Sequence, residues 1–259
     1  MTEDRNKNAP LGDNHIDDHV DEEIQQCLLA DAPKSFFMFA GAGSGKTRSL
    51  INALSFLDKE FGWEFSTNAK QVAVITYTNA ASDEISRRLQ YKPIFAVSTI
   101  HSFLWELIKN YQSDIKDWVI ASLMQDISEL NGKQAKRVTA NRTEDIKRKN
   151  NRLARIETVK RFSYNPNGDN VGYDSLNHSE VIKMGSEFIL SEDTMQKILI
   201  NKYPVLLIDE SQDTKKELVD ALFTVQEKFK QSFIVGMFGD TMQRIYNDGK
   251  DNLATCIPR

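Results

Sequence analysis

The sequence has little cysteine and no long apolar run. Its 259 residues include two cysteines, Cys27 and Cys256, which are too few and too isolated for a disulfide framework or a cysteine-based metal site. No apolar run approaches the roughly 20 residues that span a bilayer. The polar, acidic start lacks the apolar core of a secretory signal. These absences predict a reducing, cytoplasmic setting and no membrane partner.

The sequence also lacks a strong excess of charge of one sign. Thirty-three basic residues oppose 37 acidic ones, giving a net charge of −4, so the total demands neither a nucleic-acid nor a membrane partner. The charge is uneven, however, since residues 1–31 hold nine acidic and two basic residues, and residues 131–162 hold eleven basic and three acidic ones. With 40% hydrophobic residues, the chain fits one large domain, or one domain with an insertion, and not a disordered chain.

Short apolar runs alternate with helix-like stretches along much of the chain. Five runs each read as a strand buried on both faces: 35–40, 71–77, 94–99, 204–209 and 233–238. Amphipathic patterns predict helices at 21–30, 46–60, 79–89 and 215–229. This alternation predicts an α/β fold built on a doubly wound parallel sheet with right-handed crossovers.

The alternation breaks between about residues 102 and 203, where the pattern is polar and helical. We therefore expect residues 1–20 to form a flexible acidic tail. We expect residues 21–106 and 191–259 to form the α/β core, and residues 107–190 to form an inserted, mainly helical subdomain.

A phosphate-binding loop follows the first predicted strand. It consists of Ala40, Gly41, Ala42, Gly43, Ser44, Gly45, Lys46 and Thr47. In the context of strand, glycine loop and helix, this is the P-loop of NTPases, whose backbone N–H groups and helix N-terminus face phosphate oxygens. Lys46 supplies a cation for the β- and γ-phosphates of ATP, and Thr47 a hydroxyl for Mg²⁺. The usual pattern opens with Gly where this sequence has Ala40, a small departure that the three remaining glycines tolerate.

Two acids close the fourth predicted strand. We expect Asp209 to hold Mg²⁺ and Glu210 to orient and deprotonate the attacking water. Adjacent acids at a strand end are otherwise an ordinary helix N-cap pair, and it is the P-loop that favours the nucleotide site.

These strings resemble the UvrD/Rep/PcrA group of superfamily 1 DNA helicases. Five strings match the motifs of that family in the same order along the chain. Two of them are AGAGSGKTRSL and LLIDESQDT, which contain the P-loop and the two acids. The others are ITYTNAASDEI (75–85), which resembles motif Ia, VSTIHSF (97–103), which is similar to the next DNA-contacting motif, and VGMFGDTMQRIYN (235–247), which resembles motif III. The resemblance covers the α/β core well, the insertion only by position and the tail hardly at all. It implies the first, RecA-like ATP-binding domain of such a helicase.

The resemblance implies roles for further residues. Gln25 is similar to the glutamine that hydrogen-bonds the adenine edge, although the neighbouring Gln26 could equally be the matching residue. Arg48 is similar to the arginine that packs on the adenine ring. Gln243 would sense the γ-phosphate. Five positions match residues that touch single-stranded DNA in the family: Tyr77, Thr78, Asn79, His101 and Tyr246.

The aromatic positions can also be argued from their place in the chain. Tyr77 ends a strand and Tyr246 follows a strand-end loop, so both can project from the carboxyl edge where ligands bind in open sheets and stack on bases. Core packing remains an equal alternative for each ring. His101 fits either a helix N-cap or a phosphate contact. The other histidines, His15, His19 and His178, show no partner spacing and are interpreted as surface residues.

The basic segment at 131–162 has two interpretations, a solvated helix face or a contact with backbone phosphates. Its place in the insertion, which in the family lies beside DNA, leaves the two about even.

The sequence contains nothing that resembles a second RecA-like domain. We expect either the N-terminal portion of a longer helicase, with single-stranded-DNA-dependent ATPase activity and 3′-to-5′ polarity implied by resemblance, or a short protein whose partner completes the site. A second hypothesis is a non-motor ATP- and DNA-binding regulatory module of a DNA repair or phage-defence assembly. A small-molecule kinase is disfavoured, because no acceptor site is evident.

Overall fold

The computed structural model describes residues 16–29, 33–39, 45–132 and 140–240. In this part of the chain five parallel strands form one sheet in the order β1-β5-β4-β2-β3. The strands are β1 (Phe36–Phe39), β2 (Val72–Thr76), β3 (Phe95–Thr99), β4 (Val205–Ile208) and β5 (Ile234–Gly239). Each lies where the apolar runs predicted it, so the α/β class and the parallel sheet are confirmed.

The strands are buried on both faces because their apolar side chains alternate between two clusters. Phe37 and Ile75 belong to one cluster, and Phe36 and Val74 to the other. Helices therefore cover both faces of the sheet, as they must when neither face is polar.

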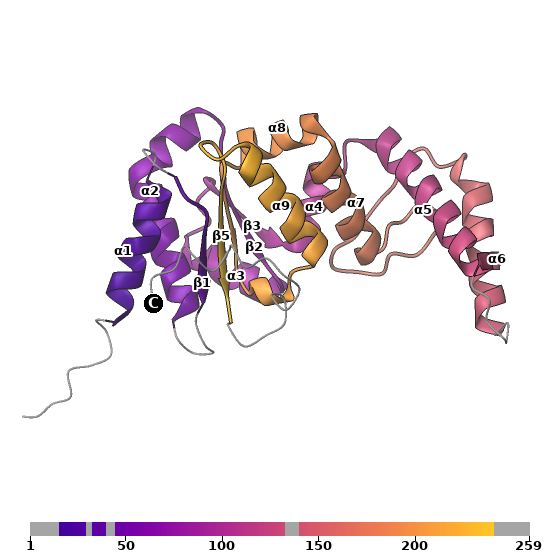
Figure 1. Cartoon of the computed structure of the whole chain (residues 1–259), viewed down its shortest axis with the longest axis horizontal. Helices are drawn as coiled ribbons and strands as arrows, with labels where there is room; N and C mark the ends of the chain where they lie inside the picture. The colour runs from indigo at the N-terminus through magenta and orange to yellow at the C-terminus, as the bar shows by residue number, and fades with distance from the viewer. Residues whose placement is uncertain (1–15, 30–32, 40–44, 133–139, 241–259) are drawn as a thin grey trace, which may run out of the picture.

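Three helices cover one face: α1 (Ile16–Leu28), α2 (Lys46–Thr67) and α3 (Asn79–Arg88). The helices with buried residues in the other cluster are α4 (Ile100–Ile108), α5 (Gln112–Gly132), α7 (His178–Ser191), α8 (Asp193–Lys202) and α9 (Lys216–Lys228), together with Ile156 at the end of α6 (Ala140–Ile156). Figure 1 shows α1 and α2 on one side of the sheet and α7, α8 and α9 on the other, with α5 and α6 farthest from α1.

Helix starts at the carboxyl edge of the sheet are fixed by local chemistry. Thr78 and Thr99 cap α3 and α4, their hydroxyls accepting from the backbone N–H groups of Ala81 and Ser102. Each hydroxyl satisfies one of the N–H groups that a helix start leaves without an intrahelical acceptor. Thr99 is also the last residue of β3, and Thr78 follows the end of β2 by two residues.

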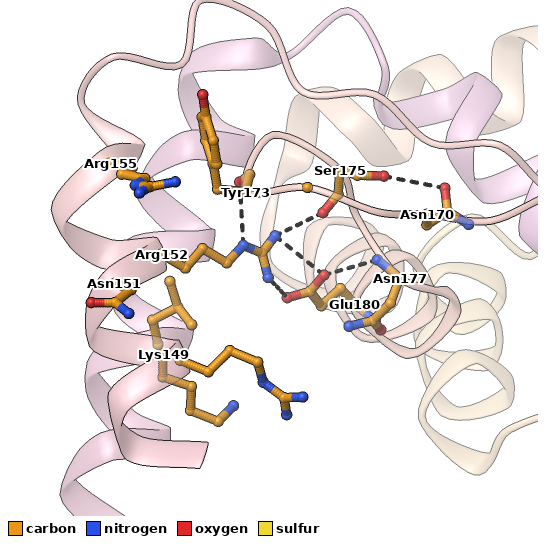
Figure 2. Close-up of a pocket in the computed structure, with 12 residues that line it drawn as sticks. Lys149, Asn151, Arg152, Arg155, Asn170, Tyr173, Ser175, Asn177 and Glu180 are labelled. Carbon is orange, nitrogen blue, oxygen red and sulfur yellow. Dashed lines mark hydrogen bonds and ion pairs between the residues drawn. The ribbon is translucent and has the colours of Figure 1, made fainter. Parts of the chain in front are cut away.

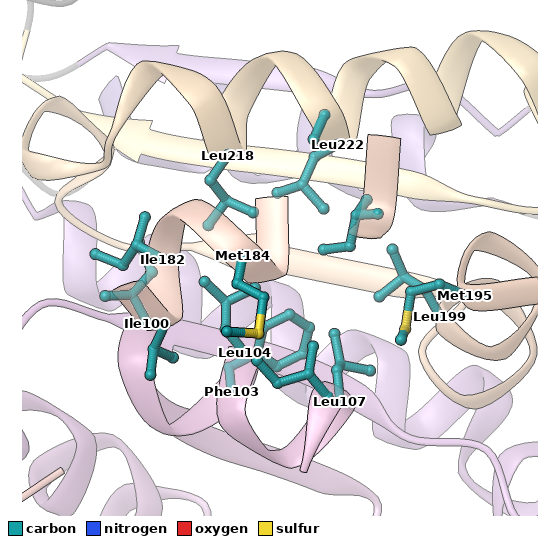
Figure 3. Packing of buried hydrophobic residues seen from close by; sticks show 14 of the residues in the cluster. Ile100, Phe103, Leu104, Leu107, Ile182, Met184, Met195, Leu199, Leu218 and Leu222 are labelled. Carbon is teal, nitrogen blue, oxygen red and sulfur yellow. The ribbon is translucent and has the colours of Figure 1, made fainter. Parts of the chain in front are cut away.

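The buried cluster around α4 and α7 continues from the sheet into the region of the predicted insertion. Met184 of α7 packs among Leu104 of α4, Leu199 of α8 and Leu222 of α9 (Figure 3). Ile115 and Val119 of α5 belong to the same cluster. The division into a core and an inserted subdomain stays a prediction. Of the predicted tail, residues 1–15 lie outside the described residues, and α1 begins at Ile16. None of the described helices is long and apolar enough to cross a membrane.

The close approach of β5 to its neighbours gives a test of this packing. A Cβ on Gly236 would lie 2.5 Å from Cζ of Phe36 and 2.6 Å from Cδ2 of Leu207. We expect Gly236→Ala to lower the free energy of unfolding by about 1–3 kcal/mol through overpacking, measured by denaturant titration. Gly132→Ala is the matched control, because a Cβ there meets nothing within 4 Å. Equal stability of the two variants would contradict the packing.

Candidate functional site

The residues expected to bind ligand gather at the carboxyl edge of the sheet. All five strands are parallel, so their carboxyl ends meet at one edge, which is where open α/β sheets bind ligands. The P-loop follows β1, Tyr77 follows β2, His101 lies just after β3, and Asp209 follows β4.

The P-loop is described at its helix end. Gly45 has φ 86°, in the left-handed region that glycine adopts without strain, and α2 begins at Lys46. Lys46 is 9% exposed, Thr47 is half-buried and Arg48 is exposed. The remaining loop residues, Ala40, Gly41, Ala42, Gly43 and Ser44, lie outside the described residues, as do Gln243 and Tyr246.

Gln25 lies on α1, where its side chain is half-buried. Helix α1 packs against α2 through Ile24 and Leu28, which share a buried cluster with Leu50 and Leu54. The glutamine is thereby carried on a helix that contacts the helix starting at the P-loop.

Asp209 is brought to the edge by the sheet itself. Its backbone N–H donates to the carbonyl of Ile75 at 2.8 Å, which continues the β2–β4 ladder past the end of β4. The side chain is 6% exposed, and burial together with the neighbouring charge of Glu210 raises its pKa to about 6, against the opposing effect of the Lys46 cation. Lys46 and Glu210 therefore both lie within electrostatic reach of Asp209.

Glu210 has an unusual backbone. Its φ and ψ are both 49°, a left-handed conformation that costs about 1–2 kcal/mol for a residue with a Cβ. Its Oε2 accepts from Nε2 of Gln212 at 2.5 Å, and Oε1 of Gln212 accepts from the backbone N–H of Asp240 at 3.2 Å. Gln212 thus joins the second acid to the end of β5.

Gln212 and Glu84 were not singled out from the sequence. Gln212 lies within the string LLIDESQDT, so the sequence shows that it belongs to the motif but not that it hydrogen-bonds Glu210. Glu84 lies on α3 and its charge also raises the pKa of Asp209; only the packing of α3 beside the sheet brings it near.

Tyr77, Thr78 and Asn79 form an exposed step between β2 and α3. Tyr77 is 55% exposed, so the alternative of core packing is wrong for this ring. The Thr78 hydroxyl is engaged in capping α3. Asn79 donates from Nδ2 to Oδ1 of Asn167, in the loop between α6 and α7, at 2.7 Å.

His101 is half-buried in the first turn of α4. Its ring packs edge-on against His178, with centroids 4.8 Å apart. Burial, and then the charge of His178, lower the pKa of His101. His178 is exposed, as interpreted from the sequence, but it also has a partner in Tyr164, whose hydroxyl lies 2.5 Å from its Nδ1. The sequence held no signal for either contact, because both join segments far apart in the chain.

The basic helix α6 is partly neutralised by neighbouring acids. Ion pairs join Arg148 to Asp145, Lys149 to Asp126 and Arg152 to Glu180. Other bases of the same helix, Lys147 and Arg155, are exposed. The structure describes both a solvated face and internal pairs, and the question of phosphate contact stays open.

A magnesium site at this edge would draw on few protein groups. Mg²⁺ commonly takes one or two carboxylates, substrate phosphates and water, and among the described residues no three acidic, cysteine or histidine side chains cluster as metal ligands. Asp209 and the Thr47 hydroxyl fit this sparse requirement. The raised pKa of Asp209 marks a carboxylate whose charge a divalent cation would stabilise.

The strain at Glu210 can be measured. We expect Glu210→Gly to raise the free energy of unfolding by about 0–1 kcal/mol, because relief of the left-handed conformation offsets the lost bond from Gln212. Ala69→Gly calibrates the gain, since Ala69 has φ 53° on an exposed turn. Thermal and denaturant unfolding measure both, and a clear loss of stability in Glu210→Gly alone would show that Glu210 is retained for the fold.

The chain is similar in sequence to known proteins. A family model described as "AAA domain" matches residues 25–248. The chain is 25% identical to the Gabija protein GajB of Bacillus cereus (strain HuB5-5), over 88% of the chain and 43% of that protein. It is also 25% identical to the ATP-dependent DNA helicase Rep of Escherichia coli (strain K12), over 81% of the chain and 34% of Rep. Rep of Buchnera aphidicola subsp. Schizaphis graminum (strain Sg) gives the same identity, with 35% of that protein covered.

The chain thus spans less than half the length of these curated relatives. The family model covers most of the described residues, including Gln25, Lys46, Asp209 and Glu210. The chain therefore belongs to the AAA domain family, and its resemblance to the N-terminal domain of UvrD/Rep-like superfamily 1 helicases is confirmed.

Proposed function

We propose that the chain binds and hydrolyses ATP as the first motor domain of a UvrD-like, single-stranded-DNA-dependent ATPase of 3′-to-5′ polarity. The observation that carries this proposal is the meeting of Lys46 with Asp209 and Glu210 at one edge of the sheet, close enough for the Lys46 charge to act on Asp209. Buried charges of both signs at a strand-to-helix edge favour a ligand that carries phosphate and a cation.

Each residue at this edge has a distinct role in the proposal. Lys46 and the N-terminus of α2 bind the β- and γ-phosphates. Thr47 and Asp209 hold Mg²⁺, which when bound neutralises charge on the phosphate oxygens. Gln25 and Arg48 bind the adenine, the first by hydrogen bonding and the second by stacking. Gln243, from the segment that resembles motif III, senses the γ-phosphate.

Glu210 is proposed to orient and deprotonate the attacking water. Its half-buried carboxylate is held by Gln212 at one oxygen, which leaves its second oxygen as the acceptor of a water proton. A strained backbone at this position is typical of a functional site, because a purely structural role favours glycine or asparagine in the left-handed region.

Single-stranded DNA is the proposed partner at the same edge. Tyr77 is exposed beside Asn79, and His101 lies one strand away. An exposed ring next to polar and imidazole groups suits base stacking with phosphate contacts. Tyr246 is proposed to add a second ring.

Motor activity requires a second RecA-like domain, in the same or another chain, because the cleft between two such domains opens and closes around ATP. A second candidate is a non-motor ATP- and DNA-binding module of a DNA repair or phage-defence assembly. The similarity of the chain to the Gabija protein GajB supports this second candidate. Phosphate release measured with and without single-stranded DNA separates the two, since a module binds nucleotide without DNA-stimulated turnover.

Two substitutions separate binding from hydrolysis. We expect Lys46→Ala to weaken ATP binding by at least about tenfold, because it removes a cation from the phosphates. We expect Glu210→Gln to leave ATP affinity within about twofold and to lower turnover at least about 100-fold, because a general base acts mainly in the transition state. Nucleotide titration and phosphate release measure the two quantities.

Lys59→Ala serves as the matched control, since Lys59 is an exposed lysine of the same helix α2. It should match the wild type in both measurements. Equal loss of ATP affinity in Lys46→Ala and Glu210→Gln would contradict the division of roles.

Because Tyr77 is exposed, a substitution there tests its role in DNA binding without disturbing the core. We expect Tyr77→Ala to weaken single-stranded DNA binding by about 1–3 kcal/mol through lost stacking, to spare ATP affinity and to change stability by less than about 0.5 kcal/mol. Tyr91→Ala is the control, because Tyr91 is 71% exposed in the turn before β3, at the opposite edge of the sheet. Unchanged DNA affinity in Tyr77→Ala would remove the ring from the interface.

A further inference from the structure

The loop at residues 163–177, between α6 and α7, reaches back to the carboxyl edge of the sheet. It contacts two of the residues that match DNA contacts in the family. Oδ1 of Asn167 accepts from Asn79 at 2.7 Å, and His178, the first residue of α7, packs on His101. Asn79 and His101 follow neighbouring strands, β2 and β3. The loop therefore borders the proposed DNA-binding edge at two separate points.

His178 is held in a defined orientation by Tyr164. The Tyr164 hydroxyl lies 2.5 Å from Nδ1 of His178, and burial raises the pKa of Tyr164 to about 12, so the phenol keeps its proton. When the neutral ring carries its hydrogen on Nε2, the hydroxyl donates to Nδ1, and when the ring is protonated the hydroxyl accepts from Nδ1. In both states Nε2 of His178 carries a hydrogen and is a donor.

The base of the loop is fixed by one arginine. Arg152 donates to the carbonyls of Tyr173 and Ser175 and pairs with Glu180 (Figure 2). The side chains of Arg152 and Glu180 are only 17% and 16% exposed. Glu180 also accepts from the backbone N–H of Asn177, completing the capping box at the start of α7. The position of His178 is thus set by a half-buried ion pair and a helix cap.

The tip of the loop is fixed by its own asparagines. Asn170 accepts from the backbone N–H of Asn165 at 2.7 Å and donates to its carbonyl at 2.9 Å. The backbone N–H of Asn167 donates to Oδ1 of Asn165 at 3.0 Å. These bonds hold Asn167 in place opposite Asn79, so the wall that the loop presents is pre-organised.

The chemistry between the two imidazoles suits an anion. The rings of His101 and His178 pack edge-on with centroids 4.8 Å apart, and burial, followed by the charge of His178, lowers the pKa of His101. Of the neighbouring groups, Tyr164 is neutral, Asn79 and Asn167 are uncharged, and Glu180 is paired with Arg152. No third metal ligand joins the pair among the described residues, which disfavours a metal and favours a phosphate that takes a hydrogen bond from each ring.

We propose that His178, oriented by Tyr164, forms with His101 a binding site for one phosphodiester of the single strand. The loop at 163–177 is then one wall of the DNA site, and the α6–α7 region contributes a direct contact beyond the family's motif residues. This proposal rests on the proposed function, because the strand must lie along the edge marked by Tyr77.

The test compares single-stranded DNA binding at pH 6 and pH 8 in the absence of nucleotide, using an oligothymidylate. A protonated imidazole forms a stronger, charge-assisted hydrogen bond to a phosphate than a neutral one, so the wild type should bind about tenfold more tightly at pH 6. His178→Gln keeps a neutral donor and should retain the pH 8 affinity within about twofold while losing most of the gain at pH 6. His178→Ala should be weaker at both pH values.

His19→Gln is the matched control, because His19 is an exposed histidine on α1, paired with Glu23. It should keep the full pH response. Wild-type affinity of His178→Ala at both pH values, with Tyr77→Ala still weakened, would overturn the phosphate site and leave the proposed function intact. A wild-type chain that binds no single-stranded DNA at either pH would instead overturn both. Melting temperatures of the histidine variants should match the wild type, since the side chain of His178 is exposed.

Discussion

The parallel pairing of β2 with β4 is the constraint on which the site depends. The bond from the backbone N–H of Asp209 to the carbonyl of Ile75 extends this ladder, so the first acid sits beside the strand that ends at Tyr77. One sheet edge thereby holds the proposed chemistry and the proposed DNA contact. A change in the position of β4 along β2 would displace both together.

Burial of charged groups at this edge of the sheet is unfavourable, and contacts within the fold offset it only in part. Asp209 is buried beside Glu210, its pKa is raised, and Lys46 opposes that rise only in part. Glu210 adopts a left-handed backbone while Gln212 holds its carboxylate. Departures from local preference that gather at one point are expected where a ligand supplies the missing stabilisation. A triphosphate with Mg²⁺ is such a ligand.

The segment between α6 and α7 is tied to the same edge. Arg152 and Glu180 hold its base, Asn165 and Asn170 its tip, and Asn167 and His178 contact the core. Movement of this segment would therefore change the surroundings of Asn79 and His101, because it contacts both side chains directly. The region that the helicase resemblance described only by position thus contacts Asn79 and His101 of the proposed site.

The sequence by itself determined the strand and helix order, because buried parallel strands read as continuous apolar runs and the P-loop has a fixed pattern. It also predicted that Lys46, Asp209 and Glu210 lie at the same sheet edge, because each follows the carboxyl end of a parallel strand. Only the tertiary structure decided that Tyr77 is exposed, that Gln212 engages Glu210, and that His178 meets His101. Those contacts depend on the order of the strands in the sheet and on where the loop between α6 and α7 packs. Periodicity and spacing along the chain do not show which distant side chains will be in contact.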